Sequence, residues 1–190
     1  MFSFMSFNVF AIGYPEMLEY VKKTPFEKEG GEIVFTKIIS VDGVSAKELY
    51  DRVLPSISYS YQDKNHAEIK VTDEDKLYIV AKGEYKVEEG FNAMFGFSYL
   101  IMSKHVVRID FKDDKLRVVI TPEVKINEYR SNGNSDVAHY VASMFPVRPQ
   151  KKEKLSREDK EDLKIFFSLC LRINSTFENI EKFARKETEW

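Results

Sequence analysis

The chain has 190 residues, of which 43% are hydrophobic and 32% are charged. A chain of this length can bury roughly two-thirds of its unfolded surface in one domain, and this composition excludes a disordered or a membrane-embedded protein. The formal net charge of −2 argues against a broad attraction to nucleic acid, and the single cysteine, Cys170, excludes an internal disulfide.

The first residues of the chain, MFSFMSFNVFA, are apolar and uncharged. Val9 and Ala11 occupy the −3 and −1 positions of a signal-cleavage site, and polar sequence follows soon after. We therefore expect residues 1–11 to be the remnant of a secretory signal and the mature protein to begin near Ile12. A short amphipathic element is the alternative, because no basic segment precedes the apolar one. No stretch of the sequence approaches the roughly 20 apolar residues of a membrane-spanning helix.

An N-terminal extension with a short helical segment is expected over residues 12–31. The β-branched residues of 32–41 then predict the first strand. Ser45 is followed three residues later by Glu48, which forms a capping box and predicts a helix beginning at this point. Pro55 is expected to kink or end that helix, because proline removes a backbone hydrogen bond.

An antiparallel meander follows, because apolar and polar residues alternate along the next segments. The first hairpin keeps its apolar side chains together if Ile69 lies opposite Ile79. This register leaves a three-residue loop at 73–75. Residues 88–97 are expected to be an irregular connection, and a long strand is expected from about Phe97.

The stretch RIDFKDDKLRVVIT, residues 108–121, predicts a second hairpin with a loop of Asp113 and Asp114. In the self-consistent register, Arg117 lies opposite Asp110. Arg108 then has no acidic residue directly opposite, so the exposed charge of this hairpin is expected to be uneven.

The sheet domain is expected to span residues 32–128, and the composition changes after it. Residues 129–155 are expected to form a loop, a short helix in VAHYVASMF and a proline-containing linker. Residues 156–187 predict one long amphipathic helix, with Ser156 in a capping position. Its apolar residues recur at helical spacing at Leu163, Phe166, Phe167, Cys170, Ile173, Phe177, Ile180 and Ala184.

The predicted fold is therefore α+β. It consists of an antiparallel sheet of about five strands, in the order strand, helix and four-strand meander, with the long C-terminal helix packed on the apolar face.

Two segments, FTKIISVDGVSAKELYDRV and VRIDFKDDKLRVVIT, resemble the bacterial domain of unknown function 4468 over roughly residues 32–126. The residues that carry the resemblance are Phe35, Val41, Gly43, Ser45, Glu48, Leu49, Tyr50, Lys112, Asp113 and Arg117. The resemblance implies a fold like that of the TATA-binding protein. It also implies export, because this family occurs mainly in exported proteins of Bacteroides and relatives. It supplies no catalytic residue, because the family has no assigned activity, and the chain departs from the family at Asp114, where the family tends to place glycine.

No motif in the sequence predicts a reaction. The three histidines lie far apart without a partner at metal-ligand spacing, and no glycine loop for phosphate or nucleophile elbow is present. The acidic clusters at 73–75 and 113–114 lie at predicted turns, where carboxylates serve turn chemistry. We expect no catalytic residue, no metal site and no cofactor.

The face of the meander that points away from the core is predicted to be basic. Its candidate partner-binding residues are Lys70, Tyr78, Lys82, Lys86, Lys104, Arg108, Lys112 and Arg117, with Lys115 beside them. The opposing acids on this face are Glu68, Glu84 and Asp110. A solvated face whose lysines prevent aggregation is the plainer alternative, and it stays open.

These observations favour a non-catalytic, exported binding or interaction module of the bacterial cell envelope, periplasmic or on the outer surface rather than cytoplasmic. The expected partner is an envelope protein or another anionic molecule rather than nucleic acid, because the face has no aromatic stacking set beyond Tyr78. The alternative is a carrier or enzyme for a small apolar ligand held between the sheet and the C-terminal helix.

Overall fold

The computed structural model describes residues 12–29, 32–60, 68–73, 77–94, 96–123, 125–131, 137–140 and 156–186. The expected signal remnant at 1–11, the second part of the expected short helix at 141–145 and the expected linker at 146–154 lie outside the described residues.

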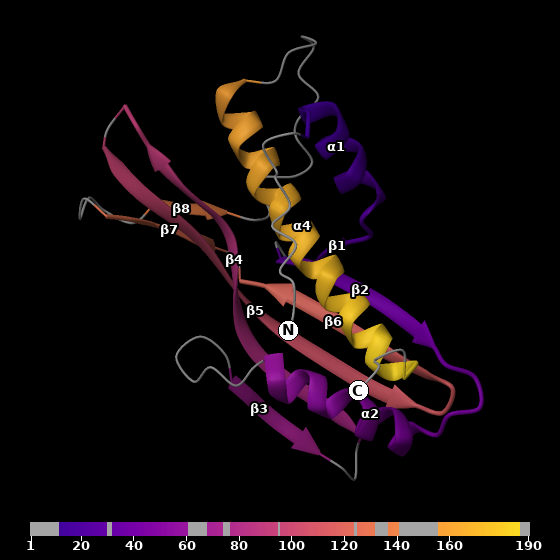
Figure 1. Ribbon diagram of the computed structural model, residues 1–190. Coiled ribbons are helices and arrows are strands. Elements are labelled where there is room, and N and C mark those ends of the chain that lie inside the picture. The colour runs from indigo at the N-terminus through magenta and orange to yellow at the C-terminus, as the bar shows by residue number, and fades with distance from the viewer. Residues whose placement is uncertain are drawn as a thin grey trace.

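The chain forms an antiparallel sheet with helices on one side of it (Figure 1). The elements are α1 (Tyr14–Lys23), β1 (Glu27–Glu29), β2 (Glu32–Ser40), α2 (Ala46–Ser60), β3 (Glu68–Asp73), β4 (Tyr78–Asn92), β5 (Phe97–Lys112), β6 (Lys115–Pro122), β7 (Lys125–Arg130), β8 (Val137–Tyr140) and α4 (Arg157–Ala184). The described strands make an eight-stranded sheet in the order β1-β2-β6-β5-β4-β3, and β7 pairs with β5 and β8. The predicted α+β class is confirmed. The expected number of about five strands is too small, because β1, β7 and β8 extend the sheet.

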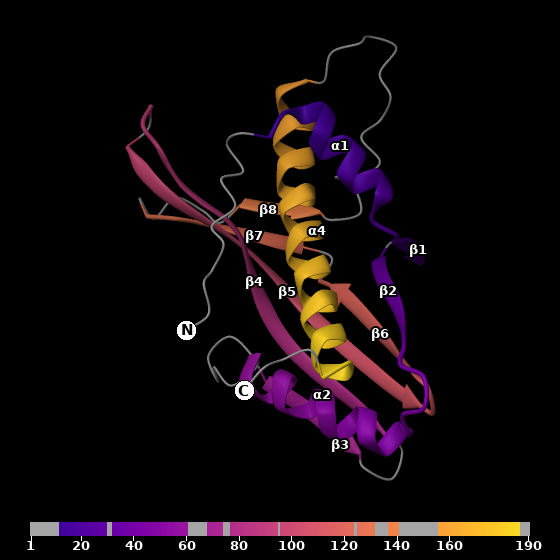
Figure 2. The ribbon, with the colours of Figure 1, turned by 45° about the vertical axis from the view of Figure 1, so that its right-hand side comes forward.

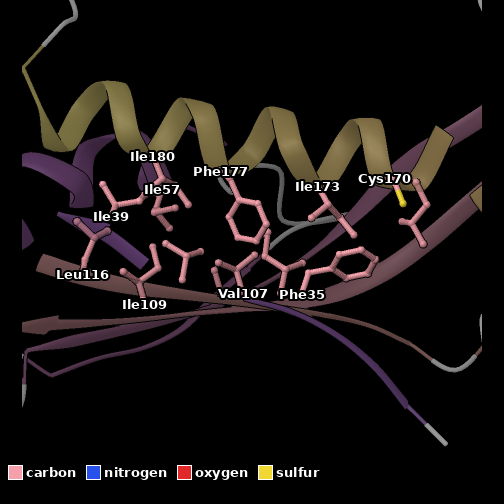
Figure 3. Packing of buried hydrophobic residues seen from close by; sticks show 14 of the residues in the cluster. Phe35, Ile39, Ile57, Val107, Ile109, Leu116, Cys170, Ile173, Phe177 and Ile180 are labelled. Atoms are coloured by element: carbon pink, nitrogen blue, oxygen red, sulfur yellow. The ribbon is translucent and has the colours of Figure 1, made fainter. Parts of the chain in front are cut away.

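The helices α2 and α4 cover one face of the sheet, which we call the inner face, and α1 packs against the N-terminal half of α4 (Figure 2). All the residues of the predicted apolar stripe of α4 are at most 3% exposed. In Figure 3, Ile173 and Phe177 of α4 point toward Phe35 of β2 and Val107 of β5. Each large apolar side chain buried in this way contributes about 2 kcal/mol, so the space between α4 and the sheet is the hydrophobic core.

The long C-terminal helix begins as predicted. The Ser156 hydroxyl accepts a hydrogen bond from the Asp159 backbone amide at 3.0 Å, and the Asp159 carboxylate accepts one from the Ser156 amide at 3.1 Å. This reciprocal capping box satisfies two amides that the helix itself leaves without acceptors.

Among the described residues, no helix is both long and apolar enough to cross a membrane.

The hairpin of β5 and β6 has the predicted register. Phe111 lies opposite Leu116, and Asp110 lies opposite Arg117. Asp114 in the turn adopts a φ of 64°. Aspartate is one of the few residues other than glycine that enters this left-handed region at modest cost, so the two-residue turn closes with two aspartates.

The expected register of β3 against β4 is wrong. Ile69 lies opposite Ala81 rather than Ile79, and a β-bulge follows Ile69. Because a bulge adds one residue to one strand, strict alternation of apolar residues does not predict the pairing across it. Asp73 consequently lies inside β3 rather than in the expected loop at 73–75.

The irregular connection expected at 88–97 is also wrong, because β4 continues to Asn92. A second bulge, between Lys86 and Glu88, shifts the register there and hides the strand from a pattern with a period of two. The paired strands beyond this bulge, residues 88–92 and 97–101, form an extension that we call the distal arm. The strand β7 pairs with its β5 side at Tyr99–Met102.

The helix α2 does not end at Pro55 but continues to Ser60. Proline leaves the carbonyl of residue 51 without its usual helical donor. Both Asp51 and Pro55 are exposed, so water can bind this carbonyl. Ile57, two residues after Pro55, is only 2% exposed, and its burial in the core holds the second half of the helix.

The segment VAHY, expected in a short helix, forms the strand β8 instead. It pairs with β7, with Val137 opposite Glu128 and Tyr140 opposite Lys125. A neighbouring strand that offers free hydrogen-bonding groups overrides the local helical preference of such a short segment.

Candidate partner-binding face

The strands β4, β5 and β6 place a set of charged and half-buried side chains on the face opposite α4. Along β5, buried and more exposed residues alternate from Ile101 to Lys112, so every second side chain points away from the core. We call this surface the basic face. It consists of Tyr78, Val80, Lys82 and Glu84 of β4, Lys104, Val106, Arg108, Asp110 and Lys112 of β5, and Lys115, Arg117 and Val119 of β6.

Asp110 lies at the centre of the basic face and holds two arginines. Its carboxylate accepts hydrogen bonds from Arg108 Nε at 2.9 Å and from Arg117 Nη2 at 2.9 Å. Burial alone would raise the pKa of Asp110, but the hydrogen bonds and charges of the two guanidinium groups outweigh it and hold the pKa below its usual value. The carboxylate is therefore ionised at neutral pH and fixes both arginines in place.

The expectation that the exposed charge of the hairpin is uneven, with Arg117 neutralised and Arg108 not, is wrong. Arg108 does lie opposite Val119, as predicted, but its side chain reaches Asp110 two residues along the same strand. Residues i and i+2 of a strand point to the same face, so a long side chain can span this distance. The guanidinium of Arg108 also lies over the ring of Tyr78, 5.1 Å from its centroid, which occupies the aromatic surface of that residue.

The predicted lysines differ in whether a nearby acidic side chain neutralises their charge. Lys104 lies 3.6 Å from Glu84, and Lys86 pairs with Glu89 at 2.8 Å. These two cations contribute little free charge to the surface. The backbone of Lys70 lies at the bulge of β3, and its side chain is outside what the structure describes.

Three exposed lysines, Lys82, Lys112 and Lys115, make no ion pair with any residue that the structure describes. Lys112 and Lys115 lie directly opposite each other on β5 and β6. Like charges opposite one another in a sheet are destabilising. This end of the basic face therefore carries positive charge at a cost in stability, and an anion bound there would relieve it.

A hollow of about 290 Å³ lies at the same end of the sheet. It is lined by Ile38, Asp110, Lys112, Lys115, Leu116 and Arg117. Ile38 of β2, at the border of this hollow, is 63% exposed. Ile38 was not among the residues predicted from sequence, because the sequence predicted a strand at 32–41 without showing which strand lies beside it.

The two aspartates of the hairpin turn have a structural role. The Asp113 carboxylate accepts a hydrogen bond from the Ala46 amide at 2.8 Å, and the Asp114 carboxylate accepts one from the Gly43 amide at 2.7 Å. Together with the Ser45 hydroxyl, which accepts from the Glu48 amide at 3.3 Å, they satisfy the start of α2 and the loop before it. Both carboxylates are thus engaged by backbone amides.

The inner face carries polar groups close to α4. Glu88 of the distal arm forms an ion pair with Lys164 of α4 and accepts a hydrogen bond from the Tyr99 hydroxyl at 2.8 Å. Burial, followed by the nearby Glu88 carboxylate, raises the pKa of Tyr99. These contacts tie the distal arm to α4.

His105 is a buried residue of the inner face. Its ring stacks on Tyr85 with centroids 3.7 Å apart, and the Tyr85 hydroxyl is hydrogen-bonded to Thr176 of α4 at 2.8 Å. Burial lowers the pKa of His105 to about 4, so this imidazole is neutral at pH 7. Over the described residues, no group of three or more His, Cys, Asp or Glu side chains could hold a metal ion.

The distal arm carries a second, open hollow of about 710 Å³ that the sequence did not predict. It is lined by Glu89, Gly90, Phe91, Ser98, Tyr99, Leu100, Tyr129, Arg130 and Ser131. Phe91 and Tyr129 are 64% and 41% exposed. Phe91 falls in the segment expected to be irregular, so its place on a strand could be read only after the bulge in β4 was known.

Residues 35–122 match the family model of the domain of unknown function DUF4468 with TBP-like fold. Two solved structures are similar to the chain. A TBP-like protein from Parabacteroides distasonis has a TM-score of 0.61 and 13% sequence identity, with 84% of this chain and 96% of that chain covered. A DUF4468 family protein from Bacteroides ovatus has a TM-score of 0.60 and 16% identity, with 84% and 90% covered. No curated protein matches the sequence. At these identities the two structures establish the shared fold alone.

Proposed function

We propose that this chain, which carries a DUF4468 domain of TBP-like fold in residues 35–122, is a non-catalytic exported module that binds an envelope protein through its basic face. One observation carries the proposal. Lys82, Lys112 and Lys115 are exposed there without an ion pair in the described part of the chain, beside a central carboxylate that orients two arginines. Lysines without an ion pair, next to oriented arginines and aliphatic surface, suit a docking site for a protein of complementary charge.

The absence of catalysis is proposed from what the titratable groups do. The carboxylates of the hairpin turn bind backbone amides at the start of α2 and in the loop before it, and the Asp110 carboxylate is held by two arginines. His105 is buried with a lowered pKa and stacks on Tyr85. None of these groups combines an exposed position with the perturbed proton affinity that general acid–base chemistry requires.

The alternative of a carrier for a small apolar ligand gains no support from the packing. Side chains from β2, β5 and α4 meet in the space between sheet and helix (Figure 3). Val107, Phe177 and Ile180 are among those that fill it, each at most 3% exposed. A carrier needs an apolar cavity at this place rather than a closed core.

Binding is tested with the doubly reversed variant Arg108→Glu with Lys82→Glu, cross-linked in native cells alongside the wild-type protein. The variant should lose an envelope partner that the wild type captures. Lys82→Glu should change the free energy of unfolding by no more than about 0.5 kcal/mol, as is usual on surfaces, whereas Arg108→Glu also removes the ion pair with Asp110 and should cost up to about 1 kcal/mol more. The matched control, Lys23→Glu with Lys182→Glu, makes the same charge change on exposed residues of α1 and α4 and should retain the partner. Equal capture by both doubly substituted proteins would remove the basic face from the mechanism.

Export is tested separately. If residues 1–11 are a signal remnant, the native protein begins near Ile12 and fractionates with the periplasm or the outer surface. Mass spectrometry that finds Met1 on a cytoplasmic native protein would contradict export.

A further inference from the structure

The strand β2 has an open edge. It pairs with β1 only at Glu32–Val34 and with β6 along its other edge at Phe35–Ser40. In the described part of the chain, no strand pairs with the remaining edge from Thr36 to Ser40. Figures 1 and 2 both show β2 as the outermost strand on this side of the sheet beyond the short β1.

The direction of the free hydrogen-bonding groups follows from the register. The two residues that flank a two-residue hairpin turn form a backbone hydrogen-bonded pair. The backbone N–H and C=O groups of Lys115, and of every second residue after it, therefore bond to β5. The alternate residues of β6 therefore bond to β2, where their partners are Ile39, Lys37 and Phe35. The hydrogen bond of 2.8 Å from the Val41 amide to the Asp114 carbonyl continues this series.

The backbone N–H and C=O groups of Thr36, Ile38 and Ser40 consequently point to the open edge. Their side chains lie on the outer side of the sheet, in line with the basic face, because Thr36 pairs with Val119 and Ile38 pairs with Arg117. One short segment thus combines free backbone donors and acceptors with an aliphatic side chain that is 63% exposed.

The lysine on this edge strand does not protect it in the usual way. A lysine in the middle of an edge normally discourages further strand pairing. Lys37 is such a residue, but its ammonium group forms an ion pair of 2.7 Å with Glu181 of α4 on the inner face. Its charge is compensated there, so Lys37 does not present a free cation at the edge beside Ile38.

The charges beside this edge select the sequence that could pair with it. Lys115 lies opposite Ser40, and Lys112 and Arg117 line the hollow that Ile38 borders. With strands about 4.8 Å apart, an added strand would lie about 10 Å from β6, a distance that the Lys115 side chain and a facing glutamate can span together, whereas Arg117 is held by Asp110 and Lys112 lies one strand further away. A strand with an apolar residue opposite Ile38 and an acidic residue opposite Ser40 matches this pattern.

We propose that the edge of β2 from Thr36 to Ser40 binds an extended acidic segment of the partner protein by adding a strand to the sheet. This inference rests on the proposed function, because the segment would belong to the partner of the basic face. A protein segment fits better than a nucleic acid, since only a polypeptide offers alternating backbone donors and acceptors. Tyr78, the one aromatic residue of the basic face, is already covered by Arg108.

The test uses a fluorescein-labelled peptide with the central sequence Glu-Val-Ile-Val-Glu, which presents the same pattern in either strand direction. Fluorescence anisotropy with the full chain should show saturable binding that weakens roughly tenfold when salt is raised from about 0.05 M to 0.5 M. Methylation of the amide nitrogen of the central isoleucine, or replacement of both glutamates by lysine, should weaken binding about tenfold or more.

Two protein variants locate the site. Ile38→Pro removes an amide that bonds to no described strand, so the fold should persist while peptide binding is lost. Ile38→Thr keeps the backbone and removes the aliphatic contact, so it should weaken binding several-fold. If Ile38→Pro fails to fold, the methylated peptide still tests strand addition without any change to the protein.

Equal binding of the methylated and unmethylated peptides would overturn strand addition, as would absence of binding by the unmodified peptide. Preferential binding of a thymidine oligonucleotide, or a mass that doubles with concentration through pairing of two β2 edges, would also overturn it. If strand addition fails while Arg108→Glu with Lys82→Glu still loses the native partner, the proposed function stands and only its mode of binding is wrong. If both fail, the basic face has no part in binding.

Discussion

Replacement of Phe167 by alanine should destabilise the isolated protein strongly, because Phe167 belongs to the stripe that fixes α4 to the fold. The side chain is 2% exposed, and its ring packs edge-on against Tyr20 of α1 with centroids 5.2 Å apart. Burial of about 150 Å² or more at roughly 25 cal/mol per Å² corresponds to about 4 kcal/mol. Because the vacated space cannot be refilled completely, we expect a loss of about 3–5 kcal/mol, a large part of a domain's stability.

Urea denaturation followed by far-ultraviolet circular dichroism measures this loss. The midpoint should fall while the slope stays constant, since the folded and unfolded states keep their compactness. Phe91→Ala is the matched control: it removes the same side chain from a position that is 64% exposed, and it should change stability by no more than about 0.5 kcal/mol. If Phe167→Ala leaves the midpoint unchanged but dissociates an oligomer, the stripe contacts another molecule and does not hold α4 in the core of its own chain.

Three further substitutions probe local features. Ser45→Ala should cost about 1 kcal/mol by removing an acceptor at the start of α2, and an unchanged thermal midpoint would mean that Asp113 alone caps the helix. Gly90→Ala would place a Cβ 2.6 Å from the Tyr99 hydroxyl and should cost about 1–3 kcal/mol; the same change made in a Tyr99→Ala protein should cost nothing more, or the clash is not the cause. Asp110 has a lowered pKa when folded, so it stabilises the protein above its unfolded pKa of about 4, and this contribution is lost as pH falls through the folded value. Stability should therefore fall less steeply below about pH 4 in Asp110→Asn than in the wild type, and parallel profiles would show that the arginines do not hold this carboxylate.

The second hairpin and the C-terminal helix could be predicted from the sequence because their signals are local. The apolar residues on both sides of Asp113 and Asp114 match only one register, and a slip by one residue would expose them all. The stripe of α4 repeats at helical spacing without interruption from Leu163 to Ala184, and every member of it is buried.

The elements that were predicted wrongly depend on contacts with other parts of the chain, and the local sequence does not show these contacts. Bulges after Ile69 and Lys86 shift the pairing by one residue, and the local pattern of apolar residues does not mark either bulge. The strand β8 exists because β7 offers it a free edge. Pro55 is tolerated in α2 because the carbonyl it leaves without a helical donor belongs to Asp51, which is exposed to solvent. The sequence pattern does not show this exposure.

The candidate face was predictable in its position but not in its charge balance. Alternation correctly places Lys82, Arg108 and Arg117 on one surface. It could not show that Asp110 serves both arginines, because that contact depends on side-chain reach along the strand. Nor could it show that Ile38, from a strand far away in the sequence, completes the hollow at the lysine end.

The most direct test of the central claim is site-specific photo-crosslinking from the basic face in the native cell. A photoreactive residue in place of Lys112 should cross-link to one envelope protein, and the same residue in place of Lys182, exposed on α4, should not. The cross-link from position 112 should also disappear when Arg108→Glu with Lys82→Glu is present. Cross-linking that is equally strong from both positions, or that occurs only from position 182, would contradict a partner-binding role for the basic face.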